Sequence, residues 1–374
     1  MNQSEKKGNR RSGVLICGAY GMSNAGDEAV LDALLAEMRS IDPDMPVTVL
    51  SRTPAETRAK HGVPAIHMFN VPAFLKVMRR SKLYVNGGGS LIQDVTSSRS
   101  LWYYLYTLIA AKHRGCKVMM YGCGIGPVRG RLNRALAGRI IDRYADAITL
   151  REEHSLGVLR ELGVRRPKIA VASDPALFLS RAETGAVDQL FETLGLERDG
   201  HYFCICVRRW PDIEKKAAIF AAAADYAHEK YGLQPVLLSI NPKQDETPSA
   251  LVGSLCKTDC AFVTAQMRID ELVGFISRMR AVMSMRLHTL IFSASQSVPL
   301  IGISYDPKVA AFLDYISETN YIQYEDLSDG RQLFALVDAA MCTGVDELKA
   351  ATEKIMSIER RNTEIARQLL EEEA

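Results

Sequence analysis

Two side chains with anion-binding and acid–base chemistry stand two residues apart, at Arg286 and His288. They follow the apolar run 281–285, which predicts a strand, and precede apolar residues from Thr289 onward, which predict a helix. In an extended segment such residues point the same way, so we expect both side chains to face one site. Arginine binds carboxylate or phosphate through a fork of N–H donors, and histidine can donate a proton near neutral pH.

A third such side chain, Lys308, lies at the end of the next predicted strand, 299–303. A histidine flanked by arginine and lysine suits a small substrate that carries both carboxylate and phosphate. The alternative is a structural arginine–aspartate pair with a histidine that caps the helix. Three such groups at adjacent strand ends favour the anion site.

A glycine-rich turn, 18–28, joins the first predicted strand to its helix. It lacks the GxGxxG spacing of dinucleotide-binding proteins and the Gly-Lys-Ser/Thr of phosphate-binding loops. Asn24 and Gly26 are candidates for binding sugar hydroxyls, and Asp27 and Glu28 for accepting hydroxyl protons. Asn24 as a helix cap, with favourable acidic charges in the first turn, is a compatible alternative.

Three consecutive glycines, 87–89, end another predicted strand, with Asp94 a few residues further. The backbone there must bend sharply or meet something closely. A tight turn without a ligand and a turn that faces a ligand are both open. On the second alternative, Gly88, Gly89 and Asp94 would bind the same sugar as Asn24 and Gly26, which we call the acceptor.

Further arginines follow predicted strand ends at Arg129, Arg151 and Arg208, and these are candidates for binding an anionic donor. The arginines after Arg129 form either a solvated helix face or a patch for anionic lipid or a lipid diphosphate. They stand at positions 131, 134, 139 and 143.

Short apolar strands alternate with amphipathic helices along the chain, which is typical of α/β proteins with parallel sheets. A lapse in periodicity over 180–188 predicts a linker. We therefore expect a GT-B-like fold of two doubly wound, Rossmann-like domains facing a central cleft. Their predicted bounds are 1–180 and 181–345, followed by a C-terminal helix over 346–374. Ligands of such sheets bind at the carboxyl ends of strands, where all the candidates lie.

Composition narrows the class of protein. The 374 residues carry a formal net charge of +2, which argues against bulk electrostatic binding to nucleic acid. Eight cysteines without paired CxxC spacing predict reduced thiols and no zinc site. The most apolar run, 101–111, is shorter than the roughly 20 residues of a membrane span and predicts a buried helix. We expect a cytoplasmic protein, neither secreted nor transmembrane.

The ordered motifs of this chain resemble those of the polysaccharide pyruvyl transferase family, and of its CsaB-type branch from bacterial cell-wall polymer synthesis. The motifs span residues 18–308, so the resemblance covers most of the chain. They are residues 21–28, 86–90 with Asp94, 124–127, 284–288 and 302–308.

The resemblance implies a GT-B-like fold, phosphoenolpyruvate as donor, and neither a metal nor a nucleotide cofactor. It implies a lipid-linked disaccharide acceptor whose N-acetylmannosamine receives a 4,6-linked ketal, in a pathway whose polymers anchor surface-layer proteins. Contact with the inner face of the cell membrane would follow. Arg286, His288 and Lys308 match the family positions expected to hold the donor.

Two other functions are weighed against this one. A GT-B glycosyltransferase that uses a nucleotide sugar would need second-domain carboxylates to hold a ribose, where Arg286 and His288 stand instead. A non-catalytic carbohydrate-binding protein would not need such a cluster of titratable groups.

Overall fold

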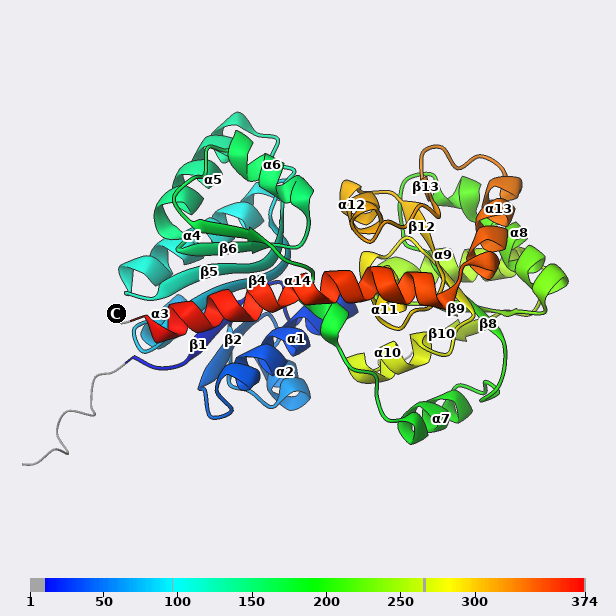
Figure 1. Cartoon of the computed structure of the whole chain (residues 1–374), viewed down its shortest axis with the longest axis horizontal. Coiled ribbons are helices and arrows are strands. Elements are labelled where there is room, and N and C mark those ends of the chain that lie inside the picture. Colours follow the sequence, from blue (N-terminus) through cyan, green and yellow to red (C-terminus); the bar gives the residue numbers. More distant parts are fainter. Residues whose placement is uncertain (1–10, 96, 265–266, 373–374) are drawn as a thin grey trace, which may run out of the picture. The chain divides into compact units, whose positions relative to one another are not determined.

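The computed structural model describes residues 11–95, 97–264 and 267–372, which divide into two compact units (Figure 1). The described part of unit 1 is 11–22, 30–95, 97–175 and 358–372, and that of unit 2 lies within 23–29 and 176–357. The division falls between Pro175 and Ala176, before the boundary predicted after residue 180. Helix α7 begins at Thr184, inside the stretch predicted as a linker.

Unit 1 is built on a sheet of seven parallel strands in the order β3-β2-β1-β4-β5-β6-β7. Most of its strands are runs of buried apolar residues, as expected of a sheet covered on both faces. Its elements are β1 Val14–Cys17, α1 Ala25–Ile41, β2 Val47–Ser51, α2 Pro54–His61, β3 Ala65–His67, α3 Val71–Met78, β4 Leu83–Ile92, α4 Ser98–His113, β5 Lys117–Ile125, α5 Arg131–Tyr144, β6 Ala147–Leu150, α6 Glu153–Glu161 and β7 Lys168–Val171.

Strand β4 differs from its prediction, because the three glycines lie within the strand and not in a turn after it. Gly88 and Gly89 have φ of 66° and 71°, and the register with β5 shifts between Gly89 and Ile92. A Cβ on Gly88 would lie 1.8 Å from Cγ1 of Val30, so helix α1 packs directly on this backbone. Glycine is needed here for the bulge and for close packing.

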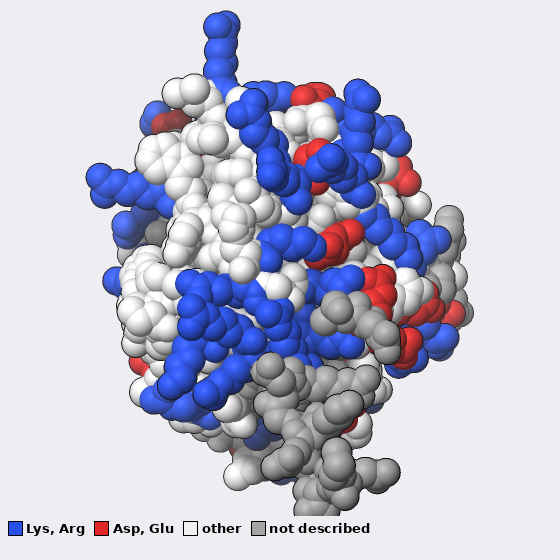
Figure 2. All heavy atoms as spheres, turned by 90° about the vertical axis from the view of Figure 1, so that its left-hand side faces the viewer, with Lys and Arg blue, Asp and Glu red and all other residues white. Residues whose placement is uncertain are grey.

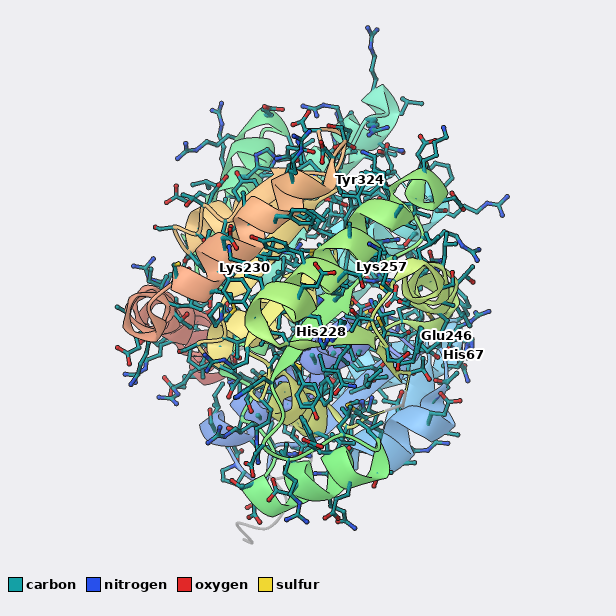
Figure 3. All side chains as sticks on the ribbon, turned by 90° about the vertical axis from the view of Figure 1, so that its right-hand side faces the viewer. His67, His228, Lys230, Glu246, Lys257 and Tyr324 are labelled. Carbon is teal, nitrogen blue, oxygen red and sulfur yellow. The ribbon has the colours of Figure 1, made fainter. Side chains whose placement is uncertain are left out.

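Unit 2 is a second doubly wound layer, with six parallel strands in the order β10-β9-β8-β11-β12-β13. Helices α8 and α13 lie side by side, and Lys230 of α8 donates to Asp338 of α13 (Figure 3). The elements are η2 Pro175–Phe178 at the junction, α7 Thr184–Thr193, β8 Tyr202–Cys206, α8 Ile213–Tyr231, β9 Gln234–Leu238, α9 Pro242–Leu255, β10 Ala261–Val263, α10 Ile269–Ile276, β11 Ala281–Ser284, α11 Leu287–Ser295, β12 Leu300–Ser304, α12 Pro307–Tyr315, β13 Tyr321–Gln323, α13 Gly330–Cys342 and α14 Val345–Glu371.

Two segments belong to a unit that is distant in sequence. Residues 23–29, which include the start of α1, cluster with unit 2. Helix α14 is divided, and its residues from Ile358 onward cluster with unit 1. There Asn362 donates to the carbonyl of Ser173, and Lys168 donates to Gln368. The chain therefore passes between the units at both of these segments as well as at Pro175.

Candidate functional site

Three neighbouring strands of unit 2, β8, β11 and β12, end at the same edge of its sheet. Arg208 follows β8, Arg286 follows β11, and Lys308 follows β12. The helices that begin at this edge point their N-terminal N–H groups, and the positive end of their dipoles, toward it. The structure thus gathers three cationic side chains and several helix N-termini at one edge.

Arg286 is held in a buried ion pair. Its Nε donates to Oδ1 of Asp245 over 2.9 Å, and its Nη2 contacts the same oxygen. Its backbone N–H donates to Oγ of Ser284 over 2.8 Å. The arginine–aspartate pair weighed in the sequence is therefore present. The pair uses Nε and Nη2, and the guanidinium has two further N–H groups on Nη1.

Asp245 links this arginine to the end of strand β9. Its Oδ2 accepts hydrogen bonds from the backbone N–H groups of Ile240, over 3.2 Å, and Asn241, over 2.8 Å. Burial raises the pKa of the Asp245 carboxyl, and the Arg286 guanidinium and these N–H groups oppose the rise. The carboxylate fixes the orientation of the guanidinium.

His288 stands in the first turn of helix α11, which begins at Leu287 and not at Thr289 as predicted. Arg286 is the N-cap, so the two side chains leave a helix start and not an extended segment. The His288 ring lies 6.3 Å from the ring of Phe292, one turn along the helix. The expectation that both side chains point the same way because they alternate along a strand is wrong, although both remain at this edge.

Gly26 lies directly against the His288 imidazole. A Cβ on Gly26 would come within 2.1 Å of Nδ1 and 2.6 Å of Cγ. The backbone N–H of the preceding Ala25 donates to the carbonyl of Ile240 over 3.3 Å. The turn over residues 23–29 is thereby joined to the Asp245–Arg286 pair, whose carboxylate binds the N–H of the same Ile240.

The acidic side chains of this turn lie beside the glycine that contacts His288. Asp27 accepts a hydrogen bond from Nδ2 of Asn24 over 2.5 Å, and Glu28 is buried. Asn24 precedes the helix, and its backbone carbonyl accepts from the N–H of Glu28. Because Gly26 contacts His288, the turn that lies against the imidazole is also the one that carries the Asn24 amide and the Asp27 and Glu28 carboxyl groups.

Arg208 forms a second cluster at this edge, with Tyr305 and Trp210. Its Nη1 donates to the hydroxyl of Tyr305 over 2.6 Å, and its guanidinium lies 4.7 Å from the Tyr305 ring centroid and 5.6 Å from that of Trp210. The aromatic faces orient the guanidinium without neutralising it.

Lys308 lies in the first turn of α12, just after Tyr305. Its Nζ stands 3.4 Å from Oδ2 of Asp306, and the Oδ1 of that residue accepts from the backbone N–H of Lys308. Both side chains are partly exposed. A loose pair of this kind leaves the ammonium able to bind a ligand.

The thiol nearest to this site is not a nucleophile. Cys206 is fully buried at the end of β8 and accepts a hydrogen bond from Thr289. Burial and the Asp245 carboxylate raise the pKa of the Cys206 thiol to about 12. Chemistry at this edge therefore depends on carboxylates, cations and the imidazole.

Arg151 belongs to unit 1, where it is buried between two carboxylates. It donates to Glu152 over 2.9 Å, to Asp174 over 3.3 Å and to Oγ of Ser90 over 3.0 Å. Burial acts to lower the pKa of Arg151, but the two carboxylates prevail and raise it. Since its charge is already compensated, Arg151 is a poorer candidate for binding an anionic donor than Arg208 or Lys308.

Arg129 and Asp94 meet in unit 1 through the backbone. Asp94 accepts hydrogen bonds from the N–H groups of Arg129, over 2.7 Å, and Gly130, over 2.9 Å, and from Nδ2 of Asn133. Burial by itself would raise the pKa of the Asp94 carboxyl, but these hydrogen bonds outweigh the effect of burial and lower the pKa. Asp94 thus fixes the start of α5, while the side chain of Arg129 is exposed. The contact predicted between Asp94 and the acceptor, and that predicted between Arg129 and the donor, stay predictions.

Three side chains described at this edge, Asp245, Tyr305 and Trp210, were not singled out from the sequence. Asp245 lies in the first turn of α9, the helix that follows β9 and begins at Asn241-Pro242. Its position just after a predicted strand end is the signal in the sequence that could have identified it. Tyr305 lies inside the 302–308 motif. Within the described part of the chain, no group of three or more His, Cys, Asp or Glu side chains is placed to hold a metal ion.

Comparison with known families gives one match over most of the chain. The family described as polysaccharide pyruvyl transferase matches residues 24–307, which include Gly26, His288, Arg208 and Arg286, and the match ends one residue before Lys308. A comparison with curated protein sequences gives no match.

Solved structures share the fold at low sequence identity. The structure of Anabaena Alr3699/HepE in complex with UDP has a TM-score of 0.65 at 12% identity, over 95% of this chain and 100% of that one. A glycosyltransferase from Rickettsia africae ESF-5 has a TM-score of 0.64 at 10% identity, over 97% and 100%. UDP-GlcNAc 2-epimerase from Neisseria meningitidis, bound to UDP-GlcNAc, has a TM-score of 0.63 at 11% identity, over 96% and 99%. The predicted GT-B-like fold of two Rossmann-like domains is confirmed.

Proposed function

The chain belongs to the polysaccharide pyruvyl transferase family, and from this premise we propose that phosphoenolpyruvate is its donor and a lipid-linked cell-wall precursor its acceptor. The enzyme transfers pyruvate to a polysaccharide, which is the activity of the family. On our proposal the product is a 4,6-linked ketal on N-acetylmannosamine, made at the inner face of the cell membrane without a metal or nucleotide cofactor. The pyruvylated polymer would serve to anchor surface-layer proteins.

The observation that carries the proposal is the edge of unit 2 where Arg208, Arg286 and Lys308 lie with His288. Phosphoenolpyruvate carries a carboxylate and a phosphate on adjacent positions, and its reaction begins with protonation of a carbon. Cationic side chains and helix N-termini suit the two anionic groups. Arg208 and Lys308 are the better candidates for direct contact, because Arg286 is already paired with Asp245.

His288, in its protonated form, donates its proton to the methylene carbon of the donor. C2 becomes oxocarbenium-like, one sugar hydroxyl bonds to it, and the bond from C2 to the phosphate oxygen breaks. The second hydroxyl then closes the ketal. After His288 regains its proton, the two hydroxyl protons have ended on the new methyl group and on the released phosphate.

The turn over residues 23–29 suits the acceptor's part in this reaction. Gly26 contacts His288, and the adjacent Asp27 and Glu28 can accept protons from the attacking hydroxyls.

The direct test is incubation of the purified chain with phosphoenolpyruvate and a synthetic lipid-linked disaccharide, followed by mass spectrometry. We expect an acceptor that has gained one pyruvate ketal, together with an equal amount of released phosphate. Parallel reactions contain UDP-glucose or UDP-N-acetylglucosamine as donor. Transfer of a hexose, with none from phosphoenolpyruvate, would show a glycosyltransferase and overturn the proposal.

A further inference from the structure

Helices α4 and α5 of unit 1 expose large apolar side chains on adjacent faces. Trp102 is 52% exposed and Tyr106 42%, one turn apart on α4. On α5, Leu132 is 80% exposed and Leu136 43%, again one turn apart. The run 101–111 was predicted as a buried helix, and only one face of α4 is buried. Residues four apart share a helix face, so each helix presents an apolar pair.

The two apolar pairs belong to one surface. The helices pack against each other, and Nε1 of Trp102 donates to Oδ1 of Asn133 over 2.9 Å. Asn133 is next to Leu132 in the chain. A contiguous exposed apolar patch marks an interaction site more often than scattered apolar residues do.

Arginines surround this patch, and acids are scarce on the two helices. Helix α4 has no aspartate or glutamate, and α5 has four arginines and a single aspartate, Asp142. Asp142 accepts from the backbone N–H groups of Arg165 and Arg166, and so is bound to the loop that follows α6. The α4–α5 surface is defined here by its exposed side chains: Arg99, Trp102, Tyr106, Arg131, Leu132, Leu136 and Arg139.

The charge of this side of the molecule agrees with that composition. Figure 2 shows the side on which α4 and α5 are labelled in Figure 1. In this view Lys and Arg side chains lie around a broad uncharged area, and most acidic side chains lie on the right-hand half. Such a surface complements a negatively charged partner that also accepts apolar side chains.

We propose that the α4–α5 surface docks on the face of a bilayer that contains anionic phospholipid. Tryptophan and tyrosine favour the boundary between headgroups and acyl chains, while leucine enters the acyl region and arginine binds lipid phosphates. In the described ranges no helix is long and apolar enough to cross a membrane, so the attachment is to the surface. This proposal does not depend on which donor the enzyme uses, because vesicle binding is measured without phosphoenolpyruvate or acceptor.

Binding is measured by co-sedimentation with vesicles of phosphatidylglycerol and phosphatidylcholine, and with vesicles of phosphatidylcholine alone. We expect binding to the anionic vesicles only, and weaker binding at high salt, because the Debye length falls to about 3 Å at 1 M. Replacing Arg131 and Arg139 by glutamine should weaken binding about 25-fold, because each arginine near an anionic membrane surface strengthens binding about fivefold. L132S/L136S should weaken it by at least about tenfold.

Matched controls come from unit 2, where Leu255 and Phe262 are also about half exposed and Lys215 and Arg331 are exposed. L255S/F262S and K215Q/R331Q should bind vesicles like the unchanged chain. Circular dichroism melts of every variant report whether it is folded.

A second readout is tryptophan fluorescence. The chain has two tryptophans, so W210F leaves Trp102 as the one indole. Its emission should shift to shorter wavelength with anionic vesicles. The proposal is overturned if no vesicle binding occurs, if folded α4–α5 variants bind like the controls, or if light scattering shows that L132S/L136S instead breaks a dimer.

Discussion

His288 is fixed by contacts from two segments that are far apart in the chain. It stands in the first turn of α11, and Gly26 lies against its ring. Its neighbour Arg286 is bound to Asp245, which is itself bound to the end of β9. The residues of this edge thus differ in their freedom: Arg286 is fixed by an ion pair, whereas Lys308 is only loosely paired.

Replacing His288 by glutamine should lower kcat by about a hundredfold to ten-thousandfold, because a general acid would be lost. KM for phosphoenolpyruvate should change little, because glutamine leaves the cationic side chains in place. Phosphate release gives both constants. The control is H228Q, since His228 lies on α8 and is exposed (Figure 3). Its Nδ1 lies 3.3 Å from the carbonyl oxygen of Leu233. Near-normal turnover in H288Q would show that His288 is not the general acid.

Replacing Arg286 by glutamine should destabilise the fold by about 3–5 kcal/mol, because it leaves Asp245 buried without its ion-pair partner. The double variant R286Q/D245N should regain most of that stability, since asparagine still accepts from the N–H groups of Ile240 and Asn241. Denaturation with urea measures both. Equal stabilities of R286Q and the unchanged chain would show that the pair contributes nothing.

The same variant should acquire a pH dependence of known sign. Burial raises the pKa of Asp245 above its ordinary value of 3.8, and Arg286 opposes this, so R286Q should raise it further. The folded state then holds a proton that the unfolded state releases. Stability of R286Q should therefore fall as pH rises above 3.8, more steeply than that of the unchanged chain, and R286Q/D245N should lack the excess slope.

At the scale of elements, the parallel sheet of unit 2 explains why residues from several motifs meet. Each strand ends at the same edge and leads to a helix whose N-terminus lies there. The start of α1 joins this edge through Ala25 and Gly26, although the rest of α1 belongs to unit 1. The position of the imidazole therefore depends on the fit between two helix starts.

Gly26→Ala tests that fit. The added Cβ would lie 2.1 Å from Nδ1 of His288, so the ring must move, and we expect kcat to fall by about a hundredfold or more. Gly157→Ala in α6 is the matched control, because its Cβ would meet nothing within 4 Å. That variant should keep full activity and gain about 0.5–1 kcal/mol of stability. Full activity of G26A would mean that the ring has no fixed catalytic position.

On the scale of the whole molecule, the second half of helix α14 belongs to unit 1, although the first half belongs to unit 2. Its residues from Ile358 onward bind unit 1 through Asn362, Gln368 and Thr363, whose hydroxyl donates to Glu37. Ile365, Ala366 and Leu369 are buried on the same helix. A domain of unit 1 cut at residue 175 would lack this cover.

Leu369→Ala should therefore destabilise the chain by about 2–5 kcal/mol, as expected for a buried leucine. Leu132→Ala, at an exposed leucine of α5, should change the free energy of unfolding by less than about 0.5 kcal/mol. Chemical denaturation followed by circular dichroism compares them. If both variants had the same stability, the cover by α14 would contribute nothing to unit 1.

Several elements could be read from the sequence because their signals are local. Short apolar runs between helices predict buried parallel strands, and all eleven strands predicted in this way are present. The predicted bounds are 13–17, 47–50, 82–85, 118–121, 147–150, 169–172, 202–207, 235–240, 261–264, 281–285 and 299–303. Strands β3 and β13 were missed, since each is three residues long and only partly apolar. The glycines of β4 were expected to end the strand, because their pairing with β5 through a bulge is not a local property.

The sequence by itself determined the alternation of strands and helices, the GT-B-like class of fold, and the strand ends at which Arg208, Arg286, His288 and Lys308 stand. It did so because periodicity and strand-end position are properties of neighbouring residues. The tertiary structure decided that Asp245 binds Arg286, that Gly26 contacts His288, and that α14 covers unit 1. These contacts join residues far apart in the chain, and packing and charge compensation select them only once the whole chain has folded.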